Sequence, residues 1–228
     1  MKKIFSFFIS LAILFLILSA LPSHAQEGEP EFVITWRSQS YTPSRFSGKV
    51  LPATRSPVIV SFEILENGKL VDLSSETIYW YLNDNLIEGR RGVQAASFFT
   101  GDTPGVTYDL RIQLNNFKDR GQILAQNVKI PVAEPQAVIE APFPRDLFSG
   151  SRITVSGEPY FFNVQSPDYL EISWEVNGEA PLNLEKSNVL DVGLTNFSSG
   201  DQVKVDLKIE NSENFFEIAA KSISLINR

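Results

Sequence analysis

The chain has 228 residues and a formal net charge of −7, and 43% of its residues are hydrophobic and 21% charged. This is the composition of a globular protein, which excludes collagen-like and low-complexity chains. Because the sequence contains no cysteine, a disulfide framework is excluded as well, and the packing of apolar side chains must supply the stability.

The first 25 residues have the pattern of a secretory signal peptide. Lys2 and Lys3 precede an uncharged apolar run over 4–21, and the small residues Ser23 and Ala25 offer a cleavage site after Ala25. An uncleaved N-terminal anchor is the competing interpretation, since the run is close to the minimum length of a membrane span. We therefore expect an extracytoplasmic protein, either secreted, periplasmic or on the cell surface, that touches the membrane only through an uncleaved N-terminal segment.

After the leader, short runs of β-branched and aromatic residues predict strands, and no segment shows sustained helical periodicity. The clearest period-two alternation falls at 58–64, 108–114 and 203–209. Clusters of Asn, Asp, Gly and Pro separate the strands and predict turns at 66–69, 83–85, 103–105 and 177–178. The pattern as a whole predicts an all-β fold.

The two halves of the chain repeat each other in order, which predicts two copies of one folding unit. The motif I-x-W-x-[LV]-N occurs at 78–83 and again at 172–177. The strand that follows also repeats, and its sequence aligns 109–112 with 206–209. Several such matches in the same order favour an internal duplication.

A proline-rich stretch over 131–144 separates the two halves and predicts a stiff connector between them. We place the domain boundary near Glu134. The predicted organisation is a signal peptide over 1–25, a first domain over 26–134 and a second domain over 135–228.

Trp80 and Trp174 hold the same position in the repeated motif. Period-two geometry puts Trp80 on one face of its strand and its neighbours Tyr79 and Tyr81 on the other. A Trp flanked by aliphatic residues at i±2 is typical of the core between two sheets. We therefore expect Trp80 and Trp174 to be structural core residues.

These features resemble immunoglobulin-like β-sandwich domains, in particular the PKD-type modules of bacterial surface proteins. The resemblance is carried by the central-strand Trp followed by an Asn-containing turn, at 80–85 and 174–178, and by a late strand entered through a Gly-containing turn at 104–108. Tyr108 stands where such folds often place a corner tyrosine. The resemblance implies two tandem immunoglobulin-like β-sandwich domains after the signal segment, and a non-catalytic scaffold or adhesion module.

Candidate catalytic groups are few in the predicted mature chain, because the only His and the only Met belong to the leader. Without His and Cys, Ser-His-Asp triads, Cys-His dyads and ordinary zinc sites are excluded. The acidic chain repels phosphate, which argues against nucleic acid as a partner. We interpret Asn83-Asp84-Asn85 as an Asx-rich turn rather than a calcium site, because the EF-hand pattern is absent. We expect no enzyme, no cofactor and no bound metal.

Tyr79 and Tyr81 are the candidates for a binding surface. As i and i+2 neighbours they lie about 7 Å apart on the outer face of their strand, where they can stack on sugar rings or anchor a protein partner; packing under a neighbouring loop is the other interpretation. The preferred hypothesis is a structural or interaction protein whose partner is an extracellular or envelope protein. The alternative is a carbohydrate-binding protein that uses Tyr79, Tyr81 and Trp36, and a third hypothesis is assembly by strand pairing at a sheet edge.

Overall fold

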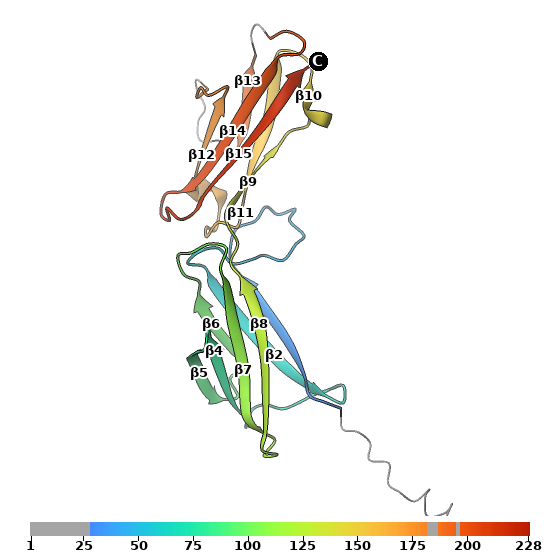
Figure 1. The fold of residues 1–228 in the computed structure, drawn as a ribbon, viewed down its shortest axis with the longest axis vertical. Helices are drawn as coiled ribbons and strands as arrows, with labels where there is room; N and C mark the ends of the chain where they lie inside the picture. Colours follow the sequence, from blue (N-terminus) through green and yellow to red (C-terminus); the bar gives the residue numbers. More distant parts are fainter. Residues whose placement is uncertain (1–27, 182–186, 195–196) are drawn as a thin grey trace, which may run out of the picture. The chain divides into compact units, whose positions relative to one another are not determined.

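The computed structural model describes residues 28–181, 187–194 and 197–228, so the predicted leader lies outside the described residues (Figure 1). The described part is built from strands, with two short 3-10 turns, η1 (Pro144–Asp146) and η2 (Pro167–Tyr169), and no α-helix. No helix in these described ranges has the length and apolar character that a membrane crossing requires. The predicted all-β fold is confirmed.

Residue contacts divide the chain into two units. Of the smaller unit the structure describes 28–33 and Ile64–Val71. In this unit Leu65 pairs with Leu70 across a turn at Asn67-Gly68, whose φ angles of 53° and 72° are the left-handed values that a tight hairpin turn requires. The turn is fixed further because the backbone N of Gly28 donates a hydrogen bond of 2.8 Å to Oδ1 of Asn67.

The strands form two β-sandwiches, and they belong to the larger unit, Ile34–Glu63 and Asp72–Arg228, except for strand residues 31–33, 64–66 and 69–70, which belong to the smaller unit. One sheet of the N-terminal sandwich has the order β1-β2-β3, with β6 also paired to β2, and the other has the order β5-β4-β7-β8. The bounds are β1 (Glu31–Ser38), β2 (Pro57–Glu66), β3 (Lys69–Leu70), β4 (Thr77–Leu82), β5 (Asn85–Arg91), β6 (Ala95–Phe99), β7 (Thr107–Phe117) and β8 (Gln122–Pro131).

The C-terminal sandwich also has two sheets, with the orders β13-β11-β9 and β10-β15-β14-β12. Strand β10 runs parallel to β15, and the other pairings described in this sandwich are antiparallel. The bounds are β9 (Gln136–Glu140), β10 (Leu147–Phe148), β11 (Arg152–Tyr160), β12 (Leu170–Val176), β13 (Val189–Gly193), β14 (Gln202–Asn211) and β15 (Ile218–Asn227). Each sandwich therefore has the layered arrangement of immunoglobulin-like domains.

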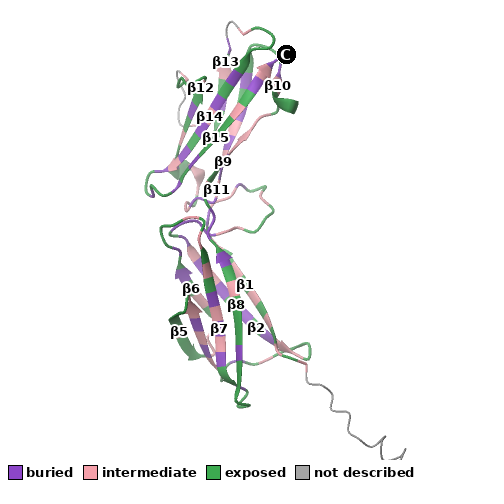
Figure 2. Ribbon diagram, in the orientation of Figure 1, coloured by how far each residue is buried: buried purple, intermediate pink, exposed green. Residues whose placement is uncertain are grey.

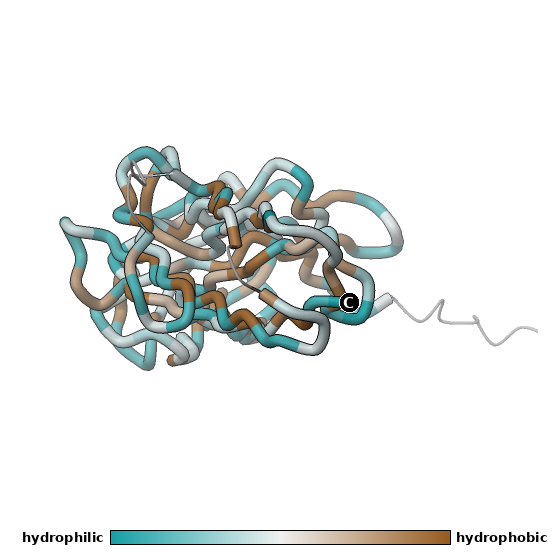
Figure 3. Tube along the Cα trace, turned by 90° about the horizontal axis from the view of Figure 1, so that it is seen from above, coloured by the Kyte–Doolittle hydropathy of each residue, from teal (hydrophilic) through white to brown (hydrophobic). Residues whose placement is uncertain are grey.

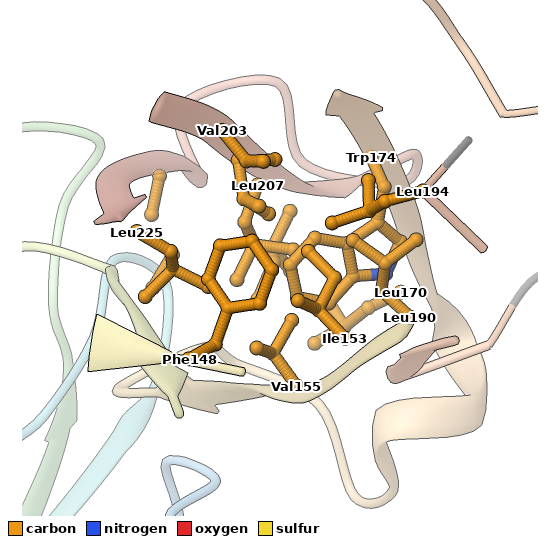
Figure 4. Packing of buried hydrophobic residues seen from close by; sticks show 14 of the residues in the cluster. Phe148, Ile153, Val155, Leu170, Trp174, Leu190, Leu194, Val203, Leu207 and Leu225 are labelled. Atoms are coloured by element: carbon orange, nitrogen blue, oxygen red, sulfur yellow. The ribbon is translucent and has the colours of Figure 1, made fainter. Parts of the chain in front are cut away.

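Buried and exposed residues alternate along the strands, and so do hydrophobic and hydrophilic ones (Figures 2 and 3). In β2, for example, Val58, Val60 and Phe62 are buried while Ser61 and Glu63 are exposed. In the C-terminal sandwich the buried side chains converge on one interior, with Trp174 among the aliphatic side chains of both sheets (Figure 4). This alternation is the period-two pattern that the sequence shows.

The two tryptophans of the repeated motif lie in equivalent surroundings. Trp80 is 0% exposed and Trp174 is 4% exposed. Nε1 of Trp80 donates a hydrogen bond to the carbonyl oxygen of Val93 at 2.9 Å, and Nε1 of Trp174 donates to that of Ser187 at 3.0 Å; both acceptors lie 13 residues downstream. Both indoles thus bury their rings and satisfy their only polar atom in the same way.

The Asn that ends each motif fixes the register of the strand that pairs with the motif strand, β7 beside β4 and β14 beside β12. Oδ1 of Asn83 accepts a hydrogen bond from the backbone N of Asp109, and Oδ1 of Asn177 accepts one from that of Lys204, each at 2.9 Å. Asp109 and Lys204 are therefore equivalent positions. The sequence alignment, which matched 109–112 with 206–209, is therefore wrong by two residues. The alternation of side chains could not reveal this error, because a shift of two residues leaves every side chain on the same face of its strand.

The connector between the two sandwiches is shorter than the proline-rich stretch over 131–144 predicts. Strand β8 ends at Pro131, and β9 already begins at Gln136 and pairs with β11. Only 132–135 lie between the two strands. The boundary near Glu134 stays a prediction.

Tyr108 begins the inward-facing series of β7, and its hydroxyl accepts a hydrogen bond of 2.7 Å from the backbone N of Gly101. Its ring packs on Phe98 with a centroid distance of 5.4 Å. This contact ties the loop before β7 to the strand, which is the structural role of a corner tyrosine.

Candidate functional site

The outer face of the sheet β5-β4-β7-β8 carries both tyrosines of the predicted binding surface. Strand β4 lies between β5 and β7, and its residues Ile78 and Trp80 are fully buried. Tyr79 and Tyr81 alternate with them and are half-buried on the opposite face. The position of the core tryptophan therefore forces both tyrosines outward.

The ring of Tyr79 lies across Gly89, its partner on β5. A Cβ atom at Gly89 would stand 3.1 Å from Cδ1 and 3.5 Å from Cε1 of Tyr79. A side chain at Gly89 would therefore press on the ring of Tyr79, so the glycine allows the ring to lie close to β5. Tyr79 is half-buried in this position.

The ring of Tyr81 is covered by Arg111, its partner on β7. The guanidinium carbon of Arg111 lies 4.5 Å from the ring centroid, within the range of a cation–π interaction. Nη1 of Arg111 also lies 3.4 Å from Oδ1 of Asp84. Nε of Arg111 is buried and has no hydrogen-bond partner among the residues that the structure describes.

The cross-strand register extends these contacts into two rows of side chains. In one row Tyr79 lies opposite Gln113, which lies opposite Ala125. In the other row Tyr81 lies opposite Arg111, which lies opposite Asn127. We call the face formed by Tyr79, Tyr81, Arg111, Gln113 and Asn127 the tyrosine face. It combines two aromatic rings with one cation and two amides.

Trp36, the third residue of the predicted carbohydrate surface, lies elsewhere. It belongs to β1 in the opposite sheet of the same sandwich. Nζ of Lys49 lies 4.1 Å from the centroid of its ring, and the same ammonium group donates a hydrogen bond to the carbonyl oxygen of Trp36. The structure therefore brings Tyr79 and Tyr81 together and separates Trp36 from them.

The oxygen-rich segment 83–85 is a tight turn in the structure. Asn83 and Asp84 have φ angles of 48° and 64°, and Nδ2 of Asn85 donates a hydrogen bond to the carbonyl oxygen of Asn83. Together with the engagement of Oδ1 of Asn83 by Asp109, these bonds leave few oxygens of the turn for a cation. Within the described ranges, no group of three or more His, Cys, Asp or Glu residues is placed to hold a metal ion.

The β14–β15 loop holds a buried carboxylate, that of Glu217. Glu217 is 0% exposed, and both of its carboxylate oxygens accept the backbone N–H of Asn163 at 3.0 Å. Oε2 also accepts Nδ2 of Asn211 at 2.8 Å. Burial raises the pKa of the Glu217 carboxyl, and these hydrogen bonds oppose the shift only in part. The sequence gives no signal for this residue, since Glu217 lies between Phe216 and Ile218, which are both exposed.

Arg111 and Gly89 are the residues of the tyrosine face that the sequence alone did not point to. Alternation along β7 places Arg111 outward, but which residue of β4 it meets depends on the strand register. Likewise, a glycine in a strand marks a close approach only once its partner is known.

Comparison with known proteins finds no matching family model and no matching curated protein. Among solved structures, the fibronectin(III)-like modules of Clostridium thermocellum CbhA are 12% identical over 86% of this chain and 94% of theirs, with a TM-score of 0.31. The three N-terminal domains of the bacteriophage RB49 Highly Immunogenic Outer Capsid protein are 12% identical over 86% of this chain and 59% of theirs, with a TM-score of 0.41.

A third similar structure is SGBP-B of the Bacteroides ovatus mixed-linkage glucan utilization locus, in complex with a mixed-linkage heptasaccharide. It is 12% identical over 86% of this chain and 47% of its own, with a TM-score of 0.24. Likeness at this level concerns the immunoglobulin-like fold and carries nothing about function.

Proposed function

We propose that the chain is a non-catalytic extracytoplasmic interaction protein, a surface scaffold or adhesion-type module, that binds an extracellular or envelope protein through the tyrosine face. The observation that carries this proposal is a pair of half-exposed aromatic rings that the fold does not require. At the equivalent outward positions of the C-terminal sandwich, Ser173 and Glu175 flank Trp174 and are exposed. The tyrosines thus occur in one sandwich and not in the other, and tyrosine is enriched in protein-binding surfaces.

Site-specific photo-crosslinking tests this proposal. With a photoreactive residue in place of Tyr81, irradiation of producing cells should give an adduct with an envelope protein, whereas the same residue in place of Glu175 should give none. The two sites are matched because each follows the core tryptophan of its sandwich by one position. Equal adducts at both positions, or none at Tyr81, would count against the tyrosine face as a partner surface.

Carbohydrate binding on the same face is the second candidate function. It is favoured by the half-buried rings of Tyr79 and Tyr81 on the outer face of the sheet, because sugar rings pack on aromatic rings. The amides of Gln113 and Asn127 belong to the same face, and amide groups can hydrogen-bond sugar hydroxyl groups.

Retention in native gels that contain soluble polysaccharides measures this second function. Replacing Tyr79 and Tyr81 by alanine should abolish the retention. Trp36→Ala should leave it unchanged, since Trp36 lies in the opposite sheet. Retention that survives loss of both tyrosines removes this candidate.

We also propose a division into domains over 26–134 and 135–228, behind a leader over 1–25, and a relationship to PKD-type modules. The division is supported by the interval between β8 and β9 and by the separate apolar interior of the C-terminal sandwich. The relationship is supported by the shared Trp and Asn positions of the two sandwiches.

A further inference from the structure

We infer that the tyrosine face binds an acidic polysaccharide, and that Arg111 recognises the carboxylate of a sugar unit stacked on the tyrosines. This inference rests on the carbohydrate candidate above and adds to it the chemical class of the ligand. Two observations carry it: the guanidinium of Arg111 lies over the ring of Tyr81, and its nearest acidic partner, Asp84, lies 3.4 Å away and is largely exposed.

The guanidinium of Arg111 is fixed in place without being neutralised by a close carboxylate. Its guanidinium carbon lies over the ring of Tyr81 and its Nε is buried, while the side chain as a whole is 35% exposed. The ion pair with Asp84 spans 3.4 Å, whereas charge-assisted hydrogen bonds measure about 2.7–2.9 Å. Because the side chain of Asp84 is 90% exposed, solvent screens this pair and it is weak.

Two other surface arginines in the described part of the chain show the difference. Arg152 binds Asp191 through two nitrogens, at 2.6 and 2.9 Å, and Arg90 binds Glu88 through two nitrogens at 2.9 Å. Both forks are occupied by a carboxylate of the chain itself. In Arg111 the buried Nε cannot take part in such a fork, so its Nη nitrogens are the groups that can meet a carboxylate from outside.

The neighbours of Arg111 favour a sugar over a peptide as the bearer of that carboxylate. Tyr79 is the diagonal neighbour of Arg111 on the next strand, about 7–8 Å away. A carboxylated sugar chain that stacks on Tyr79 can bring an acidic group of the same or the next unit over Arg111. Gln113 and Asn127 flank Arg111 with amides that suit hydroxyl groups.

The net negative charge of the chain argues against non-specific binding of an acidic polymer. With a net charge of −7, the protein repels polyanions at long range. Retention by an acidic polymer must therefore come from local contacts, and the alternative of general electrostatic attraction predicts no binding.

Affinity electrophoresis of the purified chain tests the inference. The gels contain polygalacturonate, alginate or hyaluronate, each as the native polymer or after reduction of its carboxyl groups to alcohols. We expect at least one native polymer to bind about tenfold more tightly than its reduced form. Arg111→Gln should abolish this difference, so that the native and the reduced polymer bind alike. Arg152→Gln, a matched loss of one exposed sheet arginine, should leave the difference unchanged.

The second test uses a variant, Asp84→Asn, that should bind more tightly, so its result cannot be explained by misfolding. Asp84 is the carboxylate that competes for Arg111, and asparagine tolerates its positive φ angle of 64°. Asp84→Asn should therefore bind the native polymer several-fold more tightly. An unchanged affinity would contradict the role given to Arg111.

The outcomes separate this inference from the function on which it rests. Equal binding of native and reduced polymers overturns the acidic ligand and leaves carbohydrate binding in place. No binding of either form overturns both. Retention by poly-glutamate that needs Arg111 but not Tyr79 would identify an acidic peptide as the ligand and overturn the inference.

Discussion

Replacing Trp80 by alanine should lower the free energy of unfolding by about 4 kcal/mol, a large part of the roughly 5–15 kcal/mol that keeps a domain folded. The indole is fully buried, and the ring of Phe62 packs edge-on against it with a centroid distance of 5.5 Å. The substitution leaves a cavity between the two sheets. It also leaves the carbonyl oxygen of Val93 without the 2.9 Å hydrogen bond that Nε1 donates.

Urea denaturation followed by circular dichroism measures this loss, and the other two tryptophans provide the comparison. Trp174→Ala should cost about as much, since its indole is 4% exposed and hydrogen-bonded in the same way. Trp36→Ala should cost only about 1 kcal/mol, because Trp36 is half-buried on an outer strand beneath Lys49. If Trp80→Ala were no more damaging than Trp36→Ala, Trp80 would not hold the two sheets together.

The strands and turns could be predicted because their signals are local. Alternation over 58–64 places Val58, Val60 and Phe62 inside, as the structure has them. The turn residues Asn67, Asn83 and Asn177 all have positive φ angles, since Asn and Gly tolerate the left-handed conformation that such turns need. Local rules of this kind require no knowledge of which strands are neighbours.

Register and strand order were harder to predict, because both depend on partners far away in the sequence. Alternation is unchanged by a shift of two residues, so it could not distinguish Lys204 from Asp206 as the equivalent of Asp109; the side chains of Asn83 and Asn177 decide this. Strand order likewise separates Trp36 from Tyr79 and Tyr81. An aromatic residue alone does not tell to which sheet its strand belongs.

In the candidate site, too, strand periodicity predicts one part and the cross-strand register decides the other. The outward direction of Tyr79 and Tyr81 follows from the inward direction of Trp80 and needs only the period of a strand. The partners that give the face its chemistry, Gly89 and Arg111, come from other strands and enter only through the cross-strand register. Chemistry made by pairs of residues on separate strands is therefore the part that a single sequence leaves open.

Glu217→Ala should lower the free energy of unfolding by about 2 kcal/mol at neutral pH, because it leaves buried donors without an acceptor. The carboxylate accepts hydrogen bonds from the backbone N of Asn163 and from Nδ2 of Asn211, inside a loop where it is 0% exposed. Glu213→Ala is the matched control. Glu213 is exposed in the same loop, and its loss should change the stability by less than about 0.5 kcal/mol.

The cost of losing Glu217 should also depend on pH in a defined direction. Burial raises the pKa of its carboxyl above the ordinary value of 4.5, so the folded state holds the proton more tightly than the unfolded chain does. The contribution of Glu217 to stability is therefore greatest below about pH 4.5 and declines as the pH rises through the folded-state pKa. Urea titrations between pH 4 and 8 should show the difference between the natural chain and Glu217→Gln widening toward acid, since glutamine does not titrate. A difference that narrows toward acid would mean that the hydrogen bonds from Asn163 and Asn211 outweigh burial and hold the pKa below its ordinary value.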